Sequence, residues 1–256
     1  MQLYDSHAHF ESNESETAQI LARAQAADVV RILAVGGSAE LNAGAICAQT
    51  LGHERVRLAL GMDRDQIEHP LEENLSIVKS LFADHPDMAA LGEIGLDFHY
   101  SPETARAQGE LFGHQLALAD AFNRPVIIHT READDMTRAI LDSVPWHGSG
   151  LRGVIHCYTG APKFAGQMLD RGFMVSFSGI VTFKSAEIVR DSARYVPDDR
   201  LLIETDSPFL APVPLRGKPN EPAFIAHTAK FLANLRKVSE EQLTALTYAN
   251  AVELFG

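Results

Sequence analysis

Two histidines stand at alternate positions near the start of the chain, in the segment Asp5-Ser6-His7-Ala8-His9. Alternate residues of an extended segment share a face, so His7 and His9 can present both imidazoles to one metal ion. In a chain with 11 histidines this spacing alone is weak evidence. The segment gains weight because it closes the first aliphatic run of the chain.

Four further side chains that can bind metal also close short aliphatic runs: Glu93, His129, His156 and Asp206. Each of them alone would more often be a hydrogen-bonded core residue than a ligand. Together with His7 and His9 they supply four imidazoles and two carboxylates, which suits a two-metal centre with one carboxylate as a bridge.

The elements that must bring these side chains together are short β-branched or aliphatic runs, each followed by a longer helical pattern. Runs spaced 22 to 36 residues apart fit one strand and one crossover helix per unit. Eight such units predict a (β/α)8 TIM barrel, with a doubly wound parallel sheet as the alternative. The carboxyl ends of barrel strands meet in one pocket. The predicted strands are Gln2–Asp5, Val29–Val35, Val56–Leu60, Ala89–Glu93, Val126–His129, Gly153–His156, Phe173–Ser176 and Leu201–Asp206.

The segments around and after these runs complete the predicted barrel. Helical periodicity marks residues 15–27 and 103–122, and two closing helices are predicted over 223–236 and 240–254. Ser239 and Gln242 have the spacing of a capping box. Five prolines between Ser207 and Pro222 predict an irregular loop over the pocket. With no linker or repeat, one domain over 1–256 is expected.

Other residues near the predicted strand ends are weaker candidates for a role in the site. Arg131 and Lys218 follow strands on the pocket side, so we expect them to contact an anionic substrate. Glu204 shares the inward face of Asp206 and is expected to hold a metal ligand in place by hydrogen bonding. Strand alternation turns Cys157 toward the helices, where it would pack. The chain has no glycine-rich phosphate loop, which argues against a nucleotide cofactor.

Composition and charge narrow the class of protein. The 256 residues are 46% apolar and 22% charged, as in ordinary globular proteins, and the two cysteines are expected to be free thiols. We expect no signal peptide, no membrane span, a cytoplasmic location and a monomer. The formal net charge of −12 excludes a broad basic surface for coating nucleic acid, but not a local phosphate site.

At the level of motifs, the chain from residue 5 to residue 255 closely resembles the TatD-type metal-dependent deoxyribonucleases, a branch of the metallo-dependent hydrolases with a TIM barrel. The segments that carry the resemblance include DSHAH at 5–9, GEIGLD at 92–97, PVIIH at 125–129, REA at 131–133, GVIHCYTG at 153–160, SFSGIVTFK at 176–184, ETDSP at 204–208 and GKPNEP at 217–222.

This resemblance implies two divalent cations, one on His7, His9, Glu93 and Asp206, and the other on Glu93, His129 and His156. It also implies DNA as substrate, with cleavage from 3′ ends. After the third strand the family usually has Gly-x-His-Pro, whereas this chain reads Gly61-Met62-Asp63-Arg64. The departure predicts that this loop does not make the family's usual pocket contact.

Three hypotheses about function follow. The first is hydrolysis of DNA phosphodiester bonds by a water that two metals activate, with Asp206 as general base and Glu93 as the bridge. The second is an amidohydrolase-type enzyme acting on a small amide, lactone or phosphoester; related barrels often use a lysine bridge where this chain has Glu93. The third is a metal-bound scaffold without catalysis. The ligand set is compatible with Zn, Mn, Mg, Ni or Fe.

Overall fold

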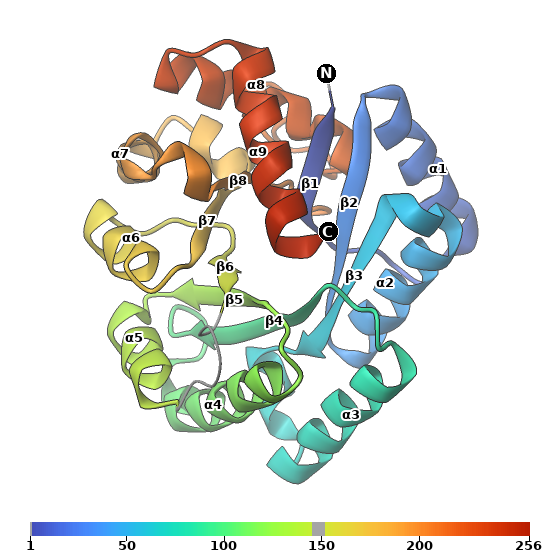
Figure 1. The fold of residues 1–256 in the computed structure, drawn as a ribbon, viewed down its shortest axis with the longest axis vertical. Helices are drawn as coiled ribbons and strands as arrows, with labels where there is room; N and C mark the ends of the chain where they lie inside the picture. Colours follow the sequence, from blue (N-terminus) through green and yellow to red (C-terminus); the bar gives the residue numbers. More distant parts are fainter. Residues whose placement is uncertain (1, 145–151) are drawn as a thin grey trace.

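The computed structural model describes residues 2–144 and 152–256, in which eight parallel strands pair in sequence order from β1 to β8. Each strand is followed by helical structure that packs outside it, as Figure 1 shows. The predicted TIM barrel is therefore confirmed, and the doubly wound alternative is wrong because the strand order never reverses. The strands are β1 Leu3–Ala8, β2 Val29–Gly37, β3 Val56–Met62, β4 Ala90–Asp97, β5 Val126–Arg131, β6 Gly153–Ile155, β7 Met174–Phe177 and β8 Leu201–Ile203.

The first and last strands meet through a short set of contacts just beyond β8. The backbone N–H of Asp206 donates to the carbonyl of His7 at 3.0 Å, and that of His9 donates to Ser207 at 2.8 Å. The buried Asp5 carboxylate accepts hydrogen bonds from the Thr205 backbone N–H at 2.9 Å and its hydroxyl at 2.6 Å. These bonds fix the segment around Asp206 against the end of β1.

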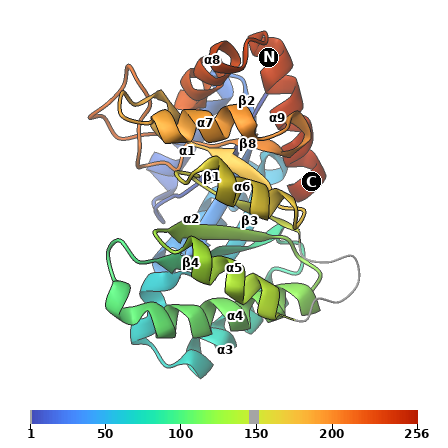
Figure 2. The ribbon, with the colours of Figure 1, turned by 90° about the vertical axis from the view of Figure 1, so that its left-hand side faces the viewer.

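Helices surround the barrel (Figures 1 and 2). The capping box predicted for the last helix is confirmed, since Ser239 Oγ accepts from the Gln242 N–H and the Gln242 side chain accepts from the Ser239 N–H. The proline-rich segment after β8 is an irregular loop, as expected, up to a 3₁₀ turn at Pro222–Phe224. The α-helices are α1 Glu14–Ala26, α2 Ala39–Gly52, α3 Leu71–Asp84, α4 Ala105–Ala121, α5 Asp134–Ser143, α6 Pro162–Leu169, α7 Glu187–Tyr195, α8 Ile225–Arg236 and α9 Glu240–Phe255.

The barrel interior is a packed apolar layer to which every strand contributes a side chain. One end of this layer is covered by α9, whose Leu254 and Phe255 pack on it. The carbonyl of Phe255 accepts a hydrogen bond from Arg57, near the start of β3, so α9 covers the amino ends of the strands. The opposite end, where the strands finish, is left for the functional site. The strand residues of this layer are Tyr4, Leu33, Val35, Ala59, Ala90, Ile127, Val154, Met174 and Leu202.

The strands do not all end where the sequence pattern predicted. β1, β4 and β5 run past the expected ends to Ala8, Asp97 and Arg131, while β8 stops at Ile203, three residues before Asp206. Within the described ranges, no helix has the length and apolar character needed to cross a membrane.

Candidate metal centre

All six side chains predicted to bind metal lie together at the carboxyl end of the barrel. His7 and Glu93 lie on β1 and β4, and His129 lies on β5. The other three follow strand ends: His9 after β1, His156 after β6, and Asp206 beyond β8. Their side chains are between 0% and 18% exposed, with His129 and Asp206 the most accessible. Two groups of donor atoms can be distinguished, and Glu93 belongs to both.

The first group contains one atom each from His7, His9, Glu93 and Asp206. The Nε2 atoms of the two histidines are 3.1 Å apart, and each lies 3.5 Å from Glu93 Oε2. Asp206 Oδ1 lies 3.8 Å from His7 Nε2 and 3.7 Å from His9 Nε2. Four potential ligand atoms therefore enclose one small space.

The second group uses the other oxygen of the same carboxylate. Glu93 Oε1 lies 3.3 Å from His129 Nδ1 and 3.5 Å from His156 Nε2. These two ring nitrogens are 3.4 Å apart. Glu93 thus presents Oε2 to one pair of histidines and Oε1 to another pair.

These distances fit divalent cations. Four ligands at roughly 2.0–2.1 Å around a tetrahedral ion are about 3.3–3.4 Å apart, and the two groups have spacings of 3.1 to 3.8 Å. Two imidazole nitrogens at 3.1 Å cannot both be protonated without repulsion. The donor set of imidazole and carboxylate suits zinc, manganese, iron or nickel. The residues present therefore fit metal ions, with Glu93 placed to be shared between two.

Two of the four imidazoles, those of His9 and His129, are oriented by a hydrogen bond on the ring nitrogen that faces away from the centre. His9 Nδ1 contacts the Val35 carbonyl at 2.9 Å, and His129 Nε2 contacts Asp97 Oδ2 at 3.0 Å. Hydrogen bonds of this kind fix the tautomer and turn the other nitrogen toward the metal. The fully buried Glu204 has Oε1 3.4 Å from His156 Nδ1, within ion-pair distance but without a hydrogen bond.

Burial and mutual charge set the protonation of the cluster. Burial raises the pKa of Glu93, but the charge of His156 and hydrogen bonds from His156, His7 and His9 together hold it well below its usual range. Burial lowers the pKa of His7 to about 3, so this imidazole is neutral. An ionised carboxylate and a neutral imidazole are the forms that bind metal. Burial lowers the pKa of His156, but Glu93 and Glu204 raise it well above its usual range, so this imidazole would release a proton when metal binds. Burial likewise raises the pKa of Asp206 above its usual range, against the charges of His156 and His9.

Arg64 also belongs to this centre, and no pattern in the sequence predicted it. It follows β3, and its Nη1 lies 2.7 Å from Glu93 Oε1. Asp97 was also missed as the partner of His129, although its position four residues after Glu93 places both on one face of β4. Both residues contact the predicted ligands directly.

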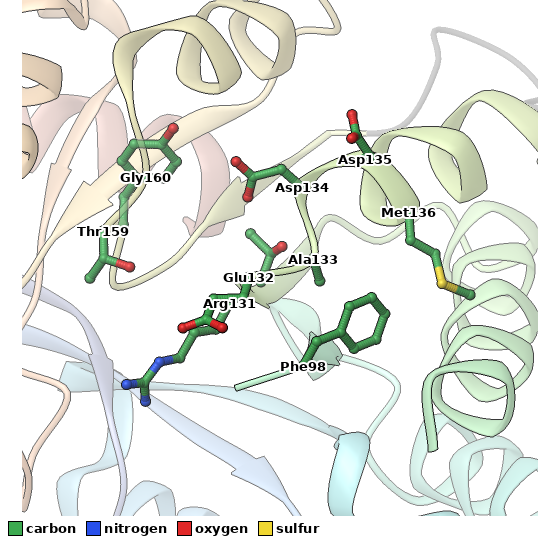
Figure 3. Close-up of a pocket in the computed structure, with 11 residues that line it drawn as sticks. Phe98, Arg131, Glu132, Ala133, Asp134, Asp135, Met136, Thr159 and Gly160 are labelled. Atoms are coloured by element: carbon green, nitrogen blue, oxygen red, sulfur yellow. The ribbon is translucent and has the colours of Figure 1, made fainter. Parts of the chain in front are cut away.

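The predicted substrate residue Arg131 ends β5, two residues after His129. It lines a hollow of about 700 Å³ that also includes Phe98 and the start of α5. Its guanidinium carbon stacks 4.8 Å from the centre of the exposed Tyr100 ring. Figure 3 shows this guanidinium pointing away from the carboxylates of Asp134 and Asp135.

Lys218 is placed differently. It is exposed in the proline-rich loop, where its backbone N–H donates to Leu215 at 3.2 Å. Among the described residues, no contact joins its side chain to the six clustered side chains. The structure therefore places Arg131 at the end of β5, two residues after His129, and Lys218 on the exposed proline-rich loop.

The predicted orientation of Cys157 is wrong. Its backbone has a φ of +44°, in the left-handed region, which breaks the alternation of the strand that precedes it. Its Sγ lies 3.2 Å from Ser178 Oγ. Burial, the charges of Asp206 and Glu204, and a side-chain contact with Asp206 raise the pKa of the thiol well above its usual range. Cys157 is therefore a neutral thiol next to Asp206, not a helix-packing residue.

A barrel with histidines and carboxylates clustered at its carboxyl end defines the class of metal-dependent hydrolases. The chain belongs to the TatD related DNase family, which it matches over residues 4–256.

Individual relatives support this assignment over most of the chain. An uncharacterized metal-dependent hydrolase of Escherichia coli, YcfH, is 43% identical, covering 100% of this chain and 96% of its own. The 3′-5′ ssDNA/RNA exonuclease TatD of Citrobacter rodentium is 38% identical over 176 residues, which cover 67% of this chain and 66% of its own. Among solved structures, the TatD homologue YjjV of Escherichia coli superimposes with a TM-score of 0.88 at 27% identity, covering 99% and 97% of the two chains.

Proposed function

We propose that this hydrolase cleaves phosphodiester bonds of DNA, acting on the 3′ end of a single strand. The observation that carries the proposal is the arrangement around Glu93, whose two oxygens each face a separate group of ligand atoms. Paired metal sites of this kind are typical of enzymes that displace an oxygen at phosphorus. The relative named as a 3′-5′ ssDNA/RNA exonuclease supports the polarity and the single-stranded substrate.

In this proposal the two groups of residues hold two divalent cations. His7, His9, Glu93 and Asp206 would hold one, while Glu93, His129 and His156 would hold the other. When bound, the cations supply positive charge that lowers the pKa of water and stabilises the phosphoryl oxygens. Zn, Mn, Mg, Ni and Fe are the candidates.

The protein residues take separate roles in the hydrolysis. Asp206 accepts a proton from the attacking water, whose oxygen forms a bond to phosphorus as the bond to the leaving oxygen breaks. Its backbone φ of +57° and its bond to the His7 carbonyl hold its side chain toward His7 and His9. The leaving oxygen then takes up a proton from solvent. Arg131, at the end of β5, and Lys218, on the exposed proline-rich loop, orient the phosphate, while Glu204 keeps His156 in place.

The bridge position favours this reaction over hydrolysis of an amide or lactone. Glu93 occupies the place on the fourth strand where amidohydrolase-type barrels often use a lysine, and the chain has no lysine between Lys79 and Lys163. The net charge of −12 opposes a broad grip on duplex DNA. The end of a DNA strand that enters the pocket does not require a broad basic surface.

The test is digestion of oligonucleotides labelled at the 3′ or the 5′ end, with each candidate metal titrated into metal-free protein. We expect early release of the 3′ label and loss of cleavage in Glu93→Ala. Glu253→Ala, an exposed glutamate on α9 near the other end of the barrel, is the matched control and should cleave like the parent. Hydrolysis of lactones or amides without cleavage of any oligonucleotide would refute the proposal, as would full activity of Glu93→Ala.

A further inference from the structure

Arg64 is an arginine built into the metal centre from a loop whose sequence departs from the family pattern. It stands where the family usually has the proline of Gly-x-His-Pro. Its side chain is only 20% exposed, and Nη1 lies 2.7 Å from Oε1 of Glu93. The same oxygen faces His129 and His156. A permanent positive charge therefore lies within hydrogen-bonding distance of the carboxylate that both ligand groups share.

The strand that leads to Arg64 is fixed by two buried amide side chains. Gln115, on α4, accepts from the Met62 N–H at 3.0 Å and donates to the Met62 carbonyl at 2.6 Å. Asn42, on α2, donates to the Gly61 carbonyl at 3.0 Å. Side-chain amides that pair with both backbone groups of one residue hold the chain in a single path. The end of β3 is thus anchored by the helices on both sides.

Asp63, the residue immediately before Arg64, continues this anchoring. Its backbone N–H donates to the Gly37 carbonyl at 2.7 Å. Its Oδ1 accepts from the Asp65 N–H at 2.8 Å and from the Gln66 side chain at 3.2 Å. These bonds cap the 3₁₀ turn Arg64–Glu68 and direct its first residue toward the barrel axis. Arg64 is therefore held at the centre by the fold and is not a surface side chain that happens to reach it.

The chemistry of the guanidinium indicates what it binds there. Arginine carries five N–H donors in a planar fork that matches the oxygens of carboxylates and phosphates. Within the described residues, the contacts of Arg64 are with Glu93 and, at 3.5 Å, with the exposed Asp65. These contacts leave donors for a further anion. A cation held by Glu93 would also weaken the attraction between that carboxylate and Arg64.

We propose that Arg64 binds a non-bridging phosphate oxygen of the substrate beside Glu93 and makes the centre selective for phosphoesters over uncharged esters. The inference rests on the proposed function for its substrate class, and it adds a specificity-determining residue. It also explains how the loop serves the site without the histidine of the family pattern. An alternative role, in which Arg64 only positions Glu93 for metal, makes a different prediction about metal content.

The experiment compares the metal-loaded parent with three variants. Arg64→Met removes the charge and keeps an unbranched apolar stem, and Arg64→Lys keeps the charge without the planar fork. Arg106→Met removes an exposed arginine of α4 that pairs with Glu110, and it is the matched control. The readouts are affinity for inorganic phosphate by calorimetry, metal content by mass spectrometry, and thermal unfolding. Rates on bis(4-nitrophenyl) phosphate and on uncharged 4-nitrophenyl acetate complete the comparison.

We expect Arg64→Met to weaken phosphate binding by roughly 10- to 100-fold, the range for a hydrogen bond to a charged group. Its KM for the phosphodiester should rise while its rate on the acetate ester and its metal content stay within about twofold of the parent. Arg64→Lys should lie between the two, and Arg106→Met should match the parent.

Two results would overturn the inference. One is unchanged phosphate affinity in Arg64→Met, and the other is loss of metal that accounts for the whole loss of phosphate binding. The phosphate measurement does not depend on DNA cleavage. If the parent binds phosphate through Arg64 but cuts no oligonucleotide, the proposed function fails and this inference stands.

Discussion

Replacing Asp97 with asparagine should weaken one metal site and leave the other intact. Asp97 Oδ2 lies 3.0 Å from His129 Nε2, while Oδ1 accepts the backbone N–H groups of His99 at 2.9 Å and Tyr100 at 3.1 Å. Burial raises the pKa of Asp97, but the hydrogen bonds from His129 and Tyr100 lower it to about 2. The carboxylate is therefore ionised at neutral pH and accepts the Nε2 proton of His129.

An asparagine cannot keep all three of these bonds. Its single carbonyl oxygen must accept from His99 and Tyr100, because turning the amide over would place N–H donors against N–H donors. The amide nitrogen then faces Nε2 of His129 and forces the ring proton onto Nδ1. Since Nδ1 lies 3.3 Å from Glu93 Oε1, on the side of the second ligand group, the lone pair needed for metal is lost.

The expected effect is a loss of roughly 10- to 100-fold in affinity at the site formed by Glu93, His129 and His156, or about 1.4 to 2.8 kcal/mol. The site that includes His7 and His9 should change by less than about threefold, because Asp97 contacts neither residue. Competition of metal-free protein with a chromogenic zinc chelator resolves the two affinities. Asp135→Asn, an exposed acid of α5, is the control and should bind like the parent. Equal weakening at both sites, or at neither, would show that Asp97 does not set the tautomer of His129.

Three further predictions concern catalysis, packing and metal-linked stability. Asp206→Asn should lower kcat on labelled oligonucleotides by roughly 10²- to 10⁴-fold; a rate near that of the parent, with metal bound, would rule out the role of proton acceptor. In Gly44→Ala the new Cβ would lie 1.8 Å from the Phe10 carbonyl oxygen, so the free energy of unfolding should fall by about 3 kcal/mol or more. In Gly113→Ala the nearest atom to the new Cβ is in Ile140, at 3.7 Å, so the free energy of unfolding should rise by about 0.5–1 kcal/mol. Urea unfolding of the two variants checks this pair, and similar midpoints would contradict it. Removing the metal with EDTA should lower the Tm by roughly 5–10 °C, because a cation at 100 times its Kd adds about 2.7 kcal/mol to the free energy of unfolding. Calorimetry with and without EDTA measures the difference. An unchanged Tm would mean that the native state binds metal weakly.

The sequence was sufficient for the barrel because each strand and helix leaves a pattern that does not depend on the rest of the fold. Aliphatic runs separated by one helix length require parallel pairing with crossovers, and eight of them close a barrel. The predicted positions of the strand ends were less accurate than the predicted order of the strands. The first and fourth strands were predicted to end at the polar residues Asp5 and Glu93, yet β1 and β4 continue past them. Both ladders shift register around the predicted ligands, between Asp5 and Ala8 and between Leu91 and Ile94, so a side chain that points into the barrel mouth disturbs the ladder without ending the strand.

At the site, the sequence predicted residues whose place follows from the strand they lie on, and it did not predict residues placed by contacts in the folded chain. The predicted ligands converged because their position at strand ends already determines where a short side chain lies. Arg64 could not be placed this way, since its reach to Glu93 depends on a turn that Asp63 caps locally and that follows a strand end held by Gln115 and Asn42, both remote in sequence. Cys157 was misplaced because a single left-handed residue reverses the direction that alternation predicts. Interactions that join distant segments therefore have to be read from the structure.

The charge of the chain gives a physical reason why the enzyme would act on the end of a DNA strand. Two divalent cations would more than neutralise Glu93 and Asp206, and Arg64 adds a further positive charge beside them. The nearby carboxylates of Asp97, Glu204 and Asp63 offset much of this charge, so the loaded pocket is far less negative than the rest of a protein of net charge −12. At physiological salt, charges more than about 8 Å apart are largely screened. A terminal phosphate inside the pocket is therefore attracted, whereas the rest of a long strand gains little from the acidic surface outside it.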